Sequence, residues 1–108
     1  TMNVVTNNNI KCTVALAGLE NVYDPEIGLN VVDLGLLYEI NFSETEKKVV
    51  CTMTLTTEFC PMGESIVEGV RQSLQSSFSD YAIEVNLTFQ PPWNYQRISE
   101  KGKEFLGR

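Results

Sequence analysis

The sequence predicts one α+β domain, a two-layer sandwich in which helices pack on a small mixed sheet. Three observations lead to this fold class. Apolar residues recur at helical spacing in two long segments, they alternate with period two in three others, and 108 residues is the length of one domain. The expected order is α-β-β-α-β-α, with residues 10–108 forming the domain and residues 1–9 a flexible lead-in.

The first half of the chain predicts one helix and a hairpin. Residues 10–23 carry a helical apolar stripe, which Asp24-Pro25 ends because proline disfavours helical geometry in the residue before it. Residues 30–34 are expected to continue extended. Residues 36–42 and 49–56 alternate with period two, so we expect two paired strands with one apolar face, and Tyr38 should share a face with Ile40.

The second half predicts a long helix, a strand and a short final helix. Pro61 is favoured at a first helical position, and apolar residues then recur at every fourth position up to Phe78. Residues 81–89 alternate as a strand does, and Pro91-Pro92 ends it. Ser99 is a suitable cap for a final helix that runs to residue 106.

Composition excludes several functional classes. Fourteen acidic against eight basic residues give a net charge of −6, which disfavours binding to nucleic acids and to anionic membranes. Histidine is absent, so Ser-His-Asp catalysis, Cys-His catalysis and histidine-ligated zinc are excluded. No apolar run approaches the ~20 residues that cross a bilayer, and the chain shows no secretory signal, so we expect a soluble cytoplasmic protein.

The three cysteines are widely spaced and form no C-x-x-C pair, which indicates reduced thiols. Cys51 alternates with the apolar residues of its strand and Cys12 lies near the first helix, so both are expected to be structural. Cys60 instead occupies a strand-to-helix turn, at the expected N-cap of the second helix, where the helix dipole favours a thiolate. Glu58 and Glu64 oppose this effect, and an unreactive cysteine under a loop is an equal alternative.

Two further groups of residues are candidates for function. Asp24, Glu26 and Asp33 form an acidic group of a kind that binds hard cations or performs acid–base chemistry. The alternative that we favour is that these carboxylates accept hydrogen bonds from loop amides. Trp93 and Tyr95 form a rigid aromatic segment that either docks a partner or, as we favour, closes the domain's own core.

The chain contains three distinctive blocks, which are DPEIGLNVVDLGL at 24–36, TTEFCP at 56–61, and PPW at 91–93 with Ile98-Ser99. Together they resemble the signatures of the SufT-like and PaaD-like iron–sulfur cluster assembly family, also called the MIP-eighteen domain. The resemblance implies an α+β fold and a maturation factor, not an enzyme, that helps deliver or insert clusters into recipient proteins. A fused P-loop ATPase and a cysteine-rich C-terminal extension are both absent, which favours a stand-alone SufT-like member over an accessory factor for phenylacetate-oxygenase maturation.

The resemblance also implies which residues are functional. By position in the motifs, they are Cys60, Asp24, Glu26, Asp33 and Trp93. We also expect Thr57 and Glu58, which precede Cys60, to be functional loop residues. Gln96 departs from the family, which commonly has an acidic residue there, and this places any function that needs a charge at that position in doubt.

One thiolate cannot hold a cluster, which generally takes about four ligands. We therefore predict that Cys60 is a transient ligand of an iron–sulfur cluster and that no cluster is tightly bound. Expected partners are iron–sulfur scaffold or carrier proteins, recipient apoproteins and a second copy of the chain. The rival is a metal-free adaptor in which Trp93, Tyr95 and the basic C-terminal residues dock a recipient or a cluster carrier. A third hypothesis, that the protein is a thiol redox enzyme, has less support, because no resolving cysteine lies near Cys60 in the sequence.

Overall fold

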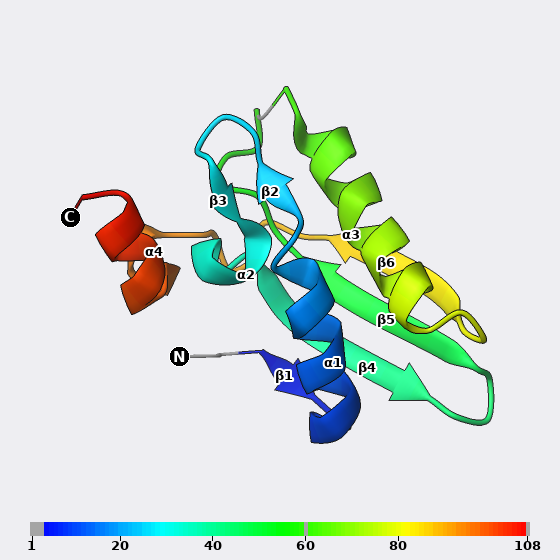
Figure 1. Cartoon of the computed structure of the whole chain (residues 1–108). Helices are drawn as coiled ribbons and strands as arrows, with labels where there is room; N and C mark the ends of the chain where they lie inside the picture. The colour runs from blue at the N-terminus through cyan, green and yellow to red at the C-terminus, as the bar shows by residue number, and fades with distance from the viewer. Residues whose placement is uncertain (1–3, 60, 108) are drawn as a thin grey trace.

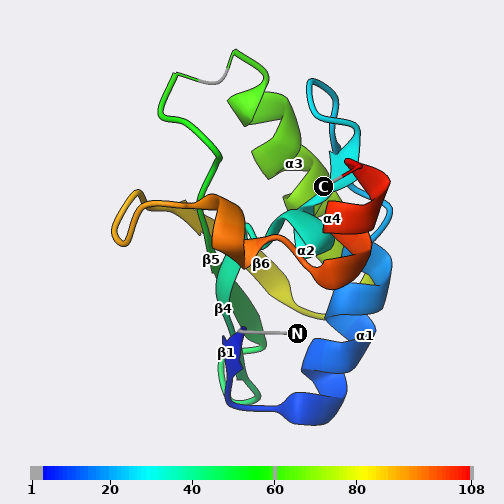
Figure 2. The same cartoon turned by 90° about the vertical axis from the view of Figure 1, so that its left-hand side faces the viewer.

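Two helices and a four-stranded sheet form the two layers of the structure, a computed structural model that describes residues 4–59 and 61–107 (Figure 1). Strand β1 (Val5–Thr6) runs parallel to β4 (Leu37–Ser43), β4 antiparallel to β5 (Lys48–Met53), and β5 parallel to β6 (Ala82–Leu87). The sheet is therefore mixed, with the order β1-β4-β5-β6. Helices α1 (Asn9–Leu19) and α3 (Gly63–Ser77) contact each other on one face of it, as Figure 2 also shows.

A smaller group of elements lies at one end of the sandwich. Strands β2 (Tyr23–Asp24) and β3 (Leu29–Asn30) form an antiparallel pair, and the helix α2 (Val31–Leu34) follows. After a 3-10 turn at Tyr95–Arg97, the C-terminal helix α4 (Glu100–Phe105) packs against α2. Ser99 caps α4 as predicted, since its Oγ accepts a hydrogen bond of 2.9 Å from the amide N–H of Gly102.

The core lies between the sheet and the two long helices. The stripe of α3 and the inward face of β5 are fully covered, and they supply the buried residues Ile66, Val70, Leu74, Val49, Cys51 and Met53. Phe42 and Phe78 pack edge to face with ring centroids 5.3 Å apart. The predicted fold class is confirmed, and so are the amphipathic second helix and the apolar face of the hairpin.

The start of the chain and the end of α1 differ from the prediction. Within the expected lead-in, Val5–Thr6 pairs with β4 as strand β1, and the side chain of Asn8 caps α1 by accepting a hydrogen bond from the amide of Lys11 at 3.0 Å. Helix α1 ends at Leu19 and does not reach residue 23. The reason is that Tyr23 pairs with Asn30 in the β2–β3 ladder, so its backbone groups are used by a strand.

The prediction of an extended segment at residues 30–34 is wrong, because Val31–Leu34 forms the helix α2. The side chain of Asn30 caps this helix by accepting a hydrogen bond of 2.9 Å from the amide of Asp33. Gly35 ends it in the left-handed region, with φ 75°. Both signals are in the sequence, but a helix of one turn shows no apolar period.

The start of α3 is also later than predicted. The first helical residue is Gly63 and the N-cap is Met62, not Pro61 and Cys60. Cys60 itself lies outside the described residues. Because it precedes the observed N-cap by two positions in the chain, the prediction that it caps the helix is wrong.

A β-bulge corrects the predicted faces of β4. Leu37 pairs with Met53 and Glu39 pairs with Thr52, so Tyr38 is an extra residue without its own partner in the ladder. As a result both Leu37 and Ile40 are buried, while Tyr38 is only half-buried. Its Oη donates a hydrogen bond of 2.6 Å to the carbonyl oxygen of Pro91.

The helices of the described ranges 4–59 and 61–107 are short, and none combines the length and the apolar character that crossing a membrane requires. The longest of them, α3, has 15 residues.

Candidate functional site

The chain between β5 and α3 contains the second sequence block. Thr54 and Leu55 are buried, and the amide of Thr54 donates to the carbonyl oxygen of Leu36 at 2.8 Å. The chain then reaches the surface: Thr57, Glu58 and Phe59 are exposed, with Phe59 88% exposed. On the other side of Cys60, Pro61 and Met62 are also exposed. The described neighbours of Cys60 therefore face solvent on both sides of it.

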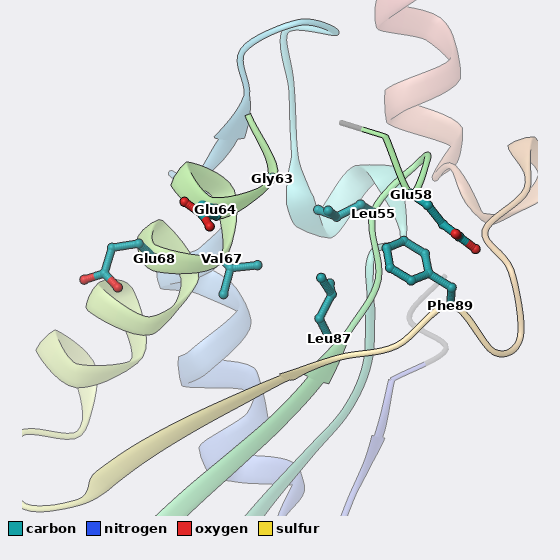
Figure 3. A pocket seen from close by; sticks show the side chains of 8 residues that line it. All are labelled: Leu55, Glu58, Gly63, Glu64, Val67, Glu68, Leu87 and Phe89. Atoms are coloured by element: carbon teal, nitrogen blue, oxygen red, sulfur yellow. The ribbon is translucent and has the colours of Figure 1, made fainter. Parts of the chain in front are cut away.

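A groove of about 370 Å³ opens beside this segment. Figure 3 shows its apolar side chains, Leu55, Val67, Leu87 and Phe89, pointing toward one another from the loop, from α3 and from the end of β6. Gly63 and three glutamates complete the lining, and the glutamates are Glu58, Glu64 and Glu68. Two of the lining residues, Glu58 and Gly63, flank Cys60 in the chain. Sequence analysis singled out Glu58 and Glu64 but missed the apolar residues. The alternation that includes Leu87 and Phe89 predicted only a strand.

The other two cysteines are buried in the core. Cys51 is 0% exposed on the inward face of β5, and Cys12 is buried on α1. Burial raises the pKa of the Cys51 thiol to about 12. Burial also raises the pKa of the Cys12 thiol, although a hydrogen bond with Thr6 opposes this effect. Both thiols are therefore protonated near neutral pH, and the structural assignment of these two cysteines is supported.

Thiol alkylation is expected to separate Cys60 from the other two cysteines. At about pH 8, iodoacetamide should modify Cys60 in the native protein, because alkylation requires a thiolate that the reagent can reach. Cys12 and Cys51 should be modified only after the chain is unfolded. Peptide mass spectrometry of samples taken with and without denaturant measures both rates. Rapid native labelling of Cys51 would contradict the buried position described above.

Asp24 organises its own loop. Its Oδ1 accepts hydrogen bonds from the amides of Glu26, at 2.9 Å, and Ile27, at 3.3 Å, while its backbone oxygen accepts from the amide of Gly28 at 2.7 Å. The side chain is buried, whereas Glu26 is exposed. These contacts agree with the alternative that we favoured from the sequence, in which the carboxylate accepts hydrogen bonds from loop amides.

Asp33 connects α2 to the C-terminal helix. Its two carboxylate oxygens accept hydrogen bonds of 2.8 Å from the side-chain amide of Asn30 and from the hydroxyl of Ser99. The amide of Ser99 also donates to the carbonyl oxygen of Asp33 at 2.8 Å. This buried carboxylate therefore ties together two segments that are 66 positions apart.

Trp93 and Arg97 bind the same short stretch of backbone. The indole Nε1 of Trp93 donates to the carbonyl oxygen of Leu34 at 2.6 Å, and the Nε of Arg97 donates to that of Gly35 at 2.7 Å. The Arg97 guanidinium also lies over the ring of Tyr38, 4.4 Å from its centroid. The first and third sequence blocks are thus joined, with a half-buried Trp93 packed against the core.

The remaining candidates of the third block lie at the surface. Tyr95 is 42% exposed, and the Nζ of Lys103 lies 5.5 Å from its ring centroid. Gln96 is exposed as well, and its backbone N–H donates to the side-chain Oδ1 of Asn94 at 2.9 Å. Partner binding by Trp93 and Tyr95 remains a prediction.

The acidic residues do not assemble into a metal site within the described parts of the chain. Across residues 4–59 and 61–107, no three or more Cys, Asp or Glu side chains are grouped so that they would hold a metal ion. The carboxylates of Asp24 and Asp33 are engaged by amides and a hydroxyl, as described above.

The fold and its loop-rich end define a class of small α+β domains. The structure is similar to a domain of unknown function, DUF59, from Bacillus anthracis, with a TM-score of 0.82, 37% identity and coverage of 93% of this chain and 98% of that one. It is also similar to a conserved hypothetical protein from Thermotoga maritima, with a TM-score of 0.76, 34% identity and full coverage of both chains.

Sequence comparison identifies the family within this class. The chain belongs to the family described as iron–sulfur cluster assembly protein, which matches residues 13–86. It is 42% identical to an Fe-S protein maturation auxiliary factor of Porphyromonas gingivalis, over 82% of this chain and 84% of that protein. It is 40% identical to the maturation auxiliary factor SufT of Staphylococcus aureus, over 80% and 97%. The predicted family resemblance is confirmed.

Proposed function

We propose that this protein is a maturation factor for iron–sulfur proteins and that Cys60 is a transient ligand of the cluster during its transfer to a recipient. The cluster is the cargo, not a resident cofactor. The family and the names of the relatives support the maturation function. We further propose that the protein acts in the cytoplasm, without catalytic turnover, together with a scaffold or carrier protein.

The observation that carries the assignment of Cys60 is the burial of the other two cysteines. Soft thiolate ligands are those that iron–sulfur clusters prefer. The chain has three cysteines, and Cys12 and Cys51 lie in the core with raised thiol pKa values. Cys60 is the one that remains, and its described neighbours, from Thr57 to Met62, are exposed.

A single thiolate suits a protein that passes its cargo on. A cluster generally takes about four ligands, so a partner, a small thiol or a second copy of this chain must complete the coordination. Helix α3 begins three positions after Cys60, and its N-cap residue, Met62, makes no side-chain capping hydrogen bond. Free amides at a helix start favour negative charge, which thiolate-ligated clusters carry.

The test is the metal content of anaerobically purified protein. After incubation with iron, sulfide and a small thiol, the wild type is expected to bind iron and sulfide and to show visible cluster absorption. Cys60→Ser should bind neither, because the hydroxyl is a poor ligand for a cluster. Cys12→Ala is the control, since it removes a buried thiol and should leave the cluster signal intact. Equal iron and sulfide in wild type and Cys60→Ser would overturn the ligand assignment and favour the metal-free adaptor.

A further inference from the structure

We propose that the groove beside the loop between β5 and α3 binds a short peptide segment of the partner protein. This segment inserts a large apolar side chain and carries Lys or Arg next to it. The groove is the one lined by Leu55, Val67, Leu87 and Phe89 with Glu58, Glu64 and Glu68. This inference rests on the proposed function only in naming the partner as a cluster carrier or recipient. The binding chemistry follows from the groove itself.

The apolar lining specifies one half of the partner's chemistry. Leu87 is 45% exposed, and Val67 and Phe89 are only half-buried, although all three point into the groove (Figure 3). A volume of about 370 Å³ lies near the lower end of the about 300–1,000 Å³ of typical ligand pockets, which is room for one or two large side chains. Covering these side chains with another apolar group removes apolar surface from water and is favourable.

The charge of the rim specifies the other half. Glu64 and Glu68 come from α3, and Glu58 comes from the loop on the opposite side. Glu68 is paired with Arg71. Among the ion pairs of residues 4–59 and 61–107, however, none involves Glu58 or Glu64. A bound segment with Lys or Arg beside its apolar anchor would complement these two carboxylates, whereas an acidic segment would be repelled.

The same charge argues against a second copy of this chain as the occupant. Each copy carries a net charge of −6, so two copies repel each other at long range. The position of the groove instead suits a partner that exchanges a cluster. Glu58 and Gly63 line the groove and flank Cys60 in sequence. A partner segment bound there is held next to the stretch of chain that contains the proposed ligand.

The experiment uses two synthetic peptides of the same Leu and Phe pattern, one with Lys and one with Glu at the remaining positions. Binding to the full chain is measured by fluorescence anisotropy and located by methyl NMR of Leu55, Val67 and Leu87. The Lys peptide should bind and shift these methyl signals, and the Glu peptide should not. Leu87→Asp should weaken binding by about tenfold or more, because it removes one apolar contact and adds a buried charge. Val14→Asp is the matched control, since Val14 is 50% exposed on α1, away from the groove lining.

A charge-reversed variant tests the proposal even if Leu87→Asp fails to fold. Glu58→Lys combined with Glu64→Lys changes two exposed side chains, and it should reverse the preference from the Lys peptide to the Glu peptide. An unchanged preference, methyl shifts outside the groove, or self-association through the groove would overturn the proposal. Failure of the proposed function is distinguishable: if Cys60→Ser still binds a cluster like the wild type while the peptide results hold, the ligand assignment fails and the docking groove stands.

Discussion

A Cys60→Ser variant is expected to lose the ability to support maturation of iron–sulfur enzymes while it unfolds at the temperature of the wild type. The substitution exchanges one atom, and the described residues next to position 60, Phe59 and Pro61, are exposed. Surface substitutions of this kind change the free energy of unfolding by about 0.5 kcal/mol or less. The measurement is the activity of iron–sulfur enzymes in extracts of cells that lack the gene and carry the variant in its place.

Cys51→Ser is the control that should show the opposite result. Cys51 is 0% exposed in the core, so the new hydroxyl would be buried among apolar side chains, at a cost of about 1–3 kcal/mol. For a domain of this size each kcal/mol lowers the melting temperature by roughly 4–8 °C. The variant should therefore melt earlier and still support maturation below its melting temperature. Normal enzyme activities with Cys60→Ser would contradict the proposed ligand, whatever the stability of the variant.

Gly35→Ala is expected to cause the largest loss of stability among single methyl additions in the described chain. Gly35 has φ 75°, a conformation that costs a residue with a Cβ about 1–3 kcal/mol. The added Cβ would also overlap the carbonyl oxygen of Arg97 and lie 2.8 Å from the Cβ of that residue. Overpacking adds about 1–3 kcal/mol, so the expected total is roughly 2–6 kcal/mol. Thermal and urea unfolding followed by circular dichroism measures it.

Gly107→Ala separates the two contributions. Gly107 has φ 77°, close to that of Gly35, but an added Cβ there has no atom within 4 Å. Gly107→Ala should therefore lose only the stability that comes from the backbone conformation, about 1–3 kcal/mol. The emission of Trp93, the single tryptophan, reports on the affected contact, because its indole donates to the carbonyl oxygen of Leu34 beside Gly35. Equal destabilisation by both substitutions, with unchanged Trp93 emission in both, would show that the approach of Arg97 to Gly35 has no energetic consequence.

Much of the fold follows from apolar periodicity alone. Helices α1 and α3 and the β4–β5 hairpin each bury one face, and Ile83 and Val85 of β6 pack partly buried against the core. Such elements show a regular pattern in sequence. Shorter elements do not. Helix α2 is one turn long and depends on Asn30 and Gly35 at its ends, and β1 exists because two residues pair with a strand more than thirty positions later. Their structure is set by capping and long-range pairing.

The candidate site was predictable in its chemistry but not in its arrangement. The motif blocks indicated Cys60, Asp24, Asp33 and Trp93, and the structure places the last three in hydrogen bonds that hold loops and the C-terminal segment. The groove could not be predicted, because its lining comes from three separate elements and sequence shows no distance between them. The bond from Ser99 to Asp33 is hidden from sequence for the same reason.

The contacts of Trp93, Arg97 and Ser99 with the backbone of residues 33–35 bear on where this domain ends. The family model matches residues 13–86, yet the carbonyl groups of residues 33, 34 and 35 accept hydrogen bonds from donors that lie beyond this range. A recombinant fragment trimmed to residues 13–86 would leave these acceptors to water and would lack helix α4, which packs against α2. The residues that follow the matched range are therefore needed to complete the hydrogen bonding at this end of the domain.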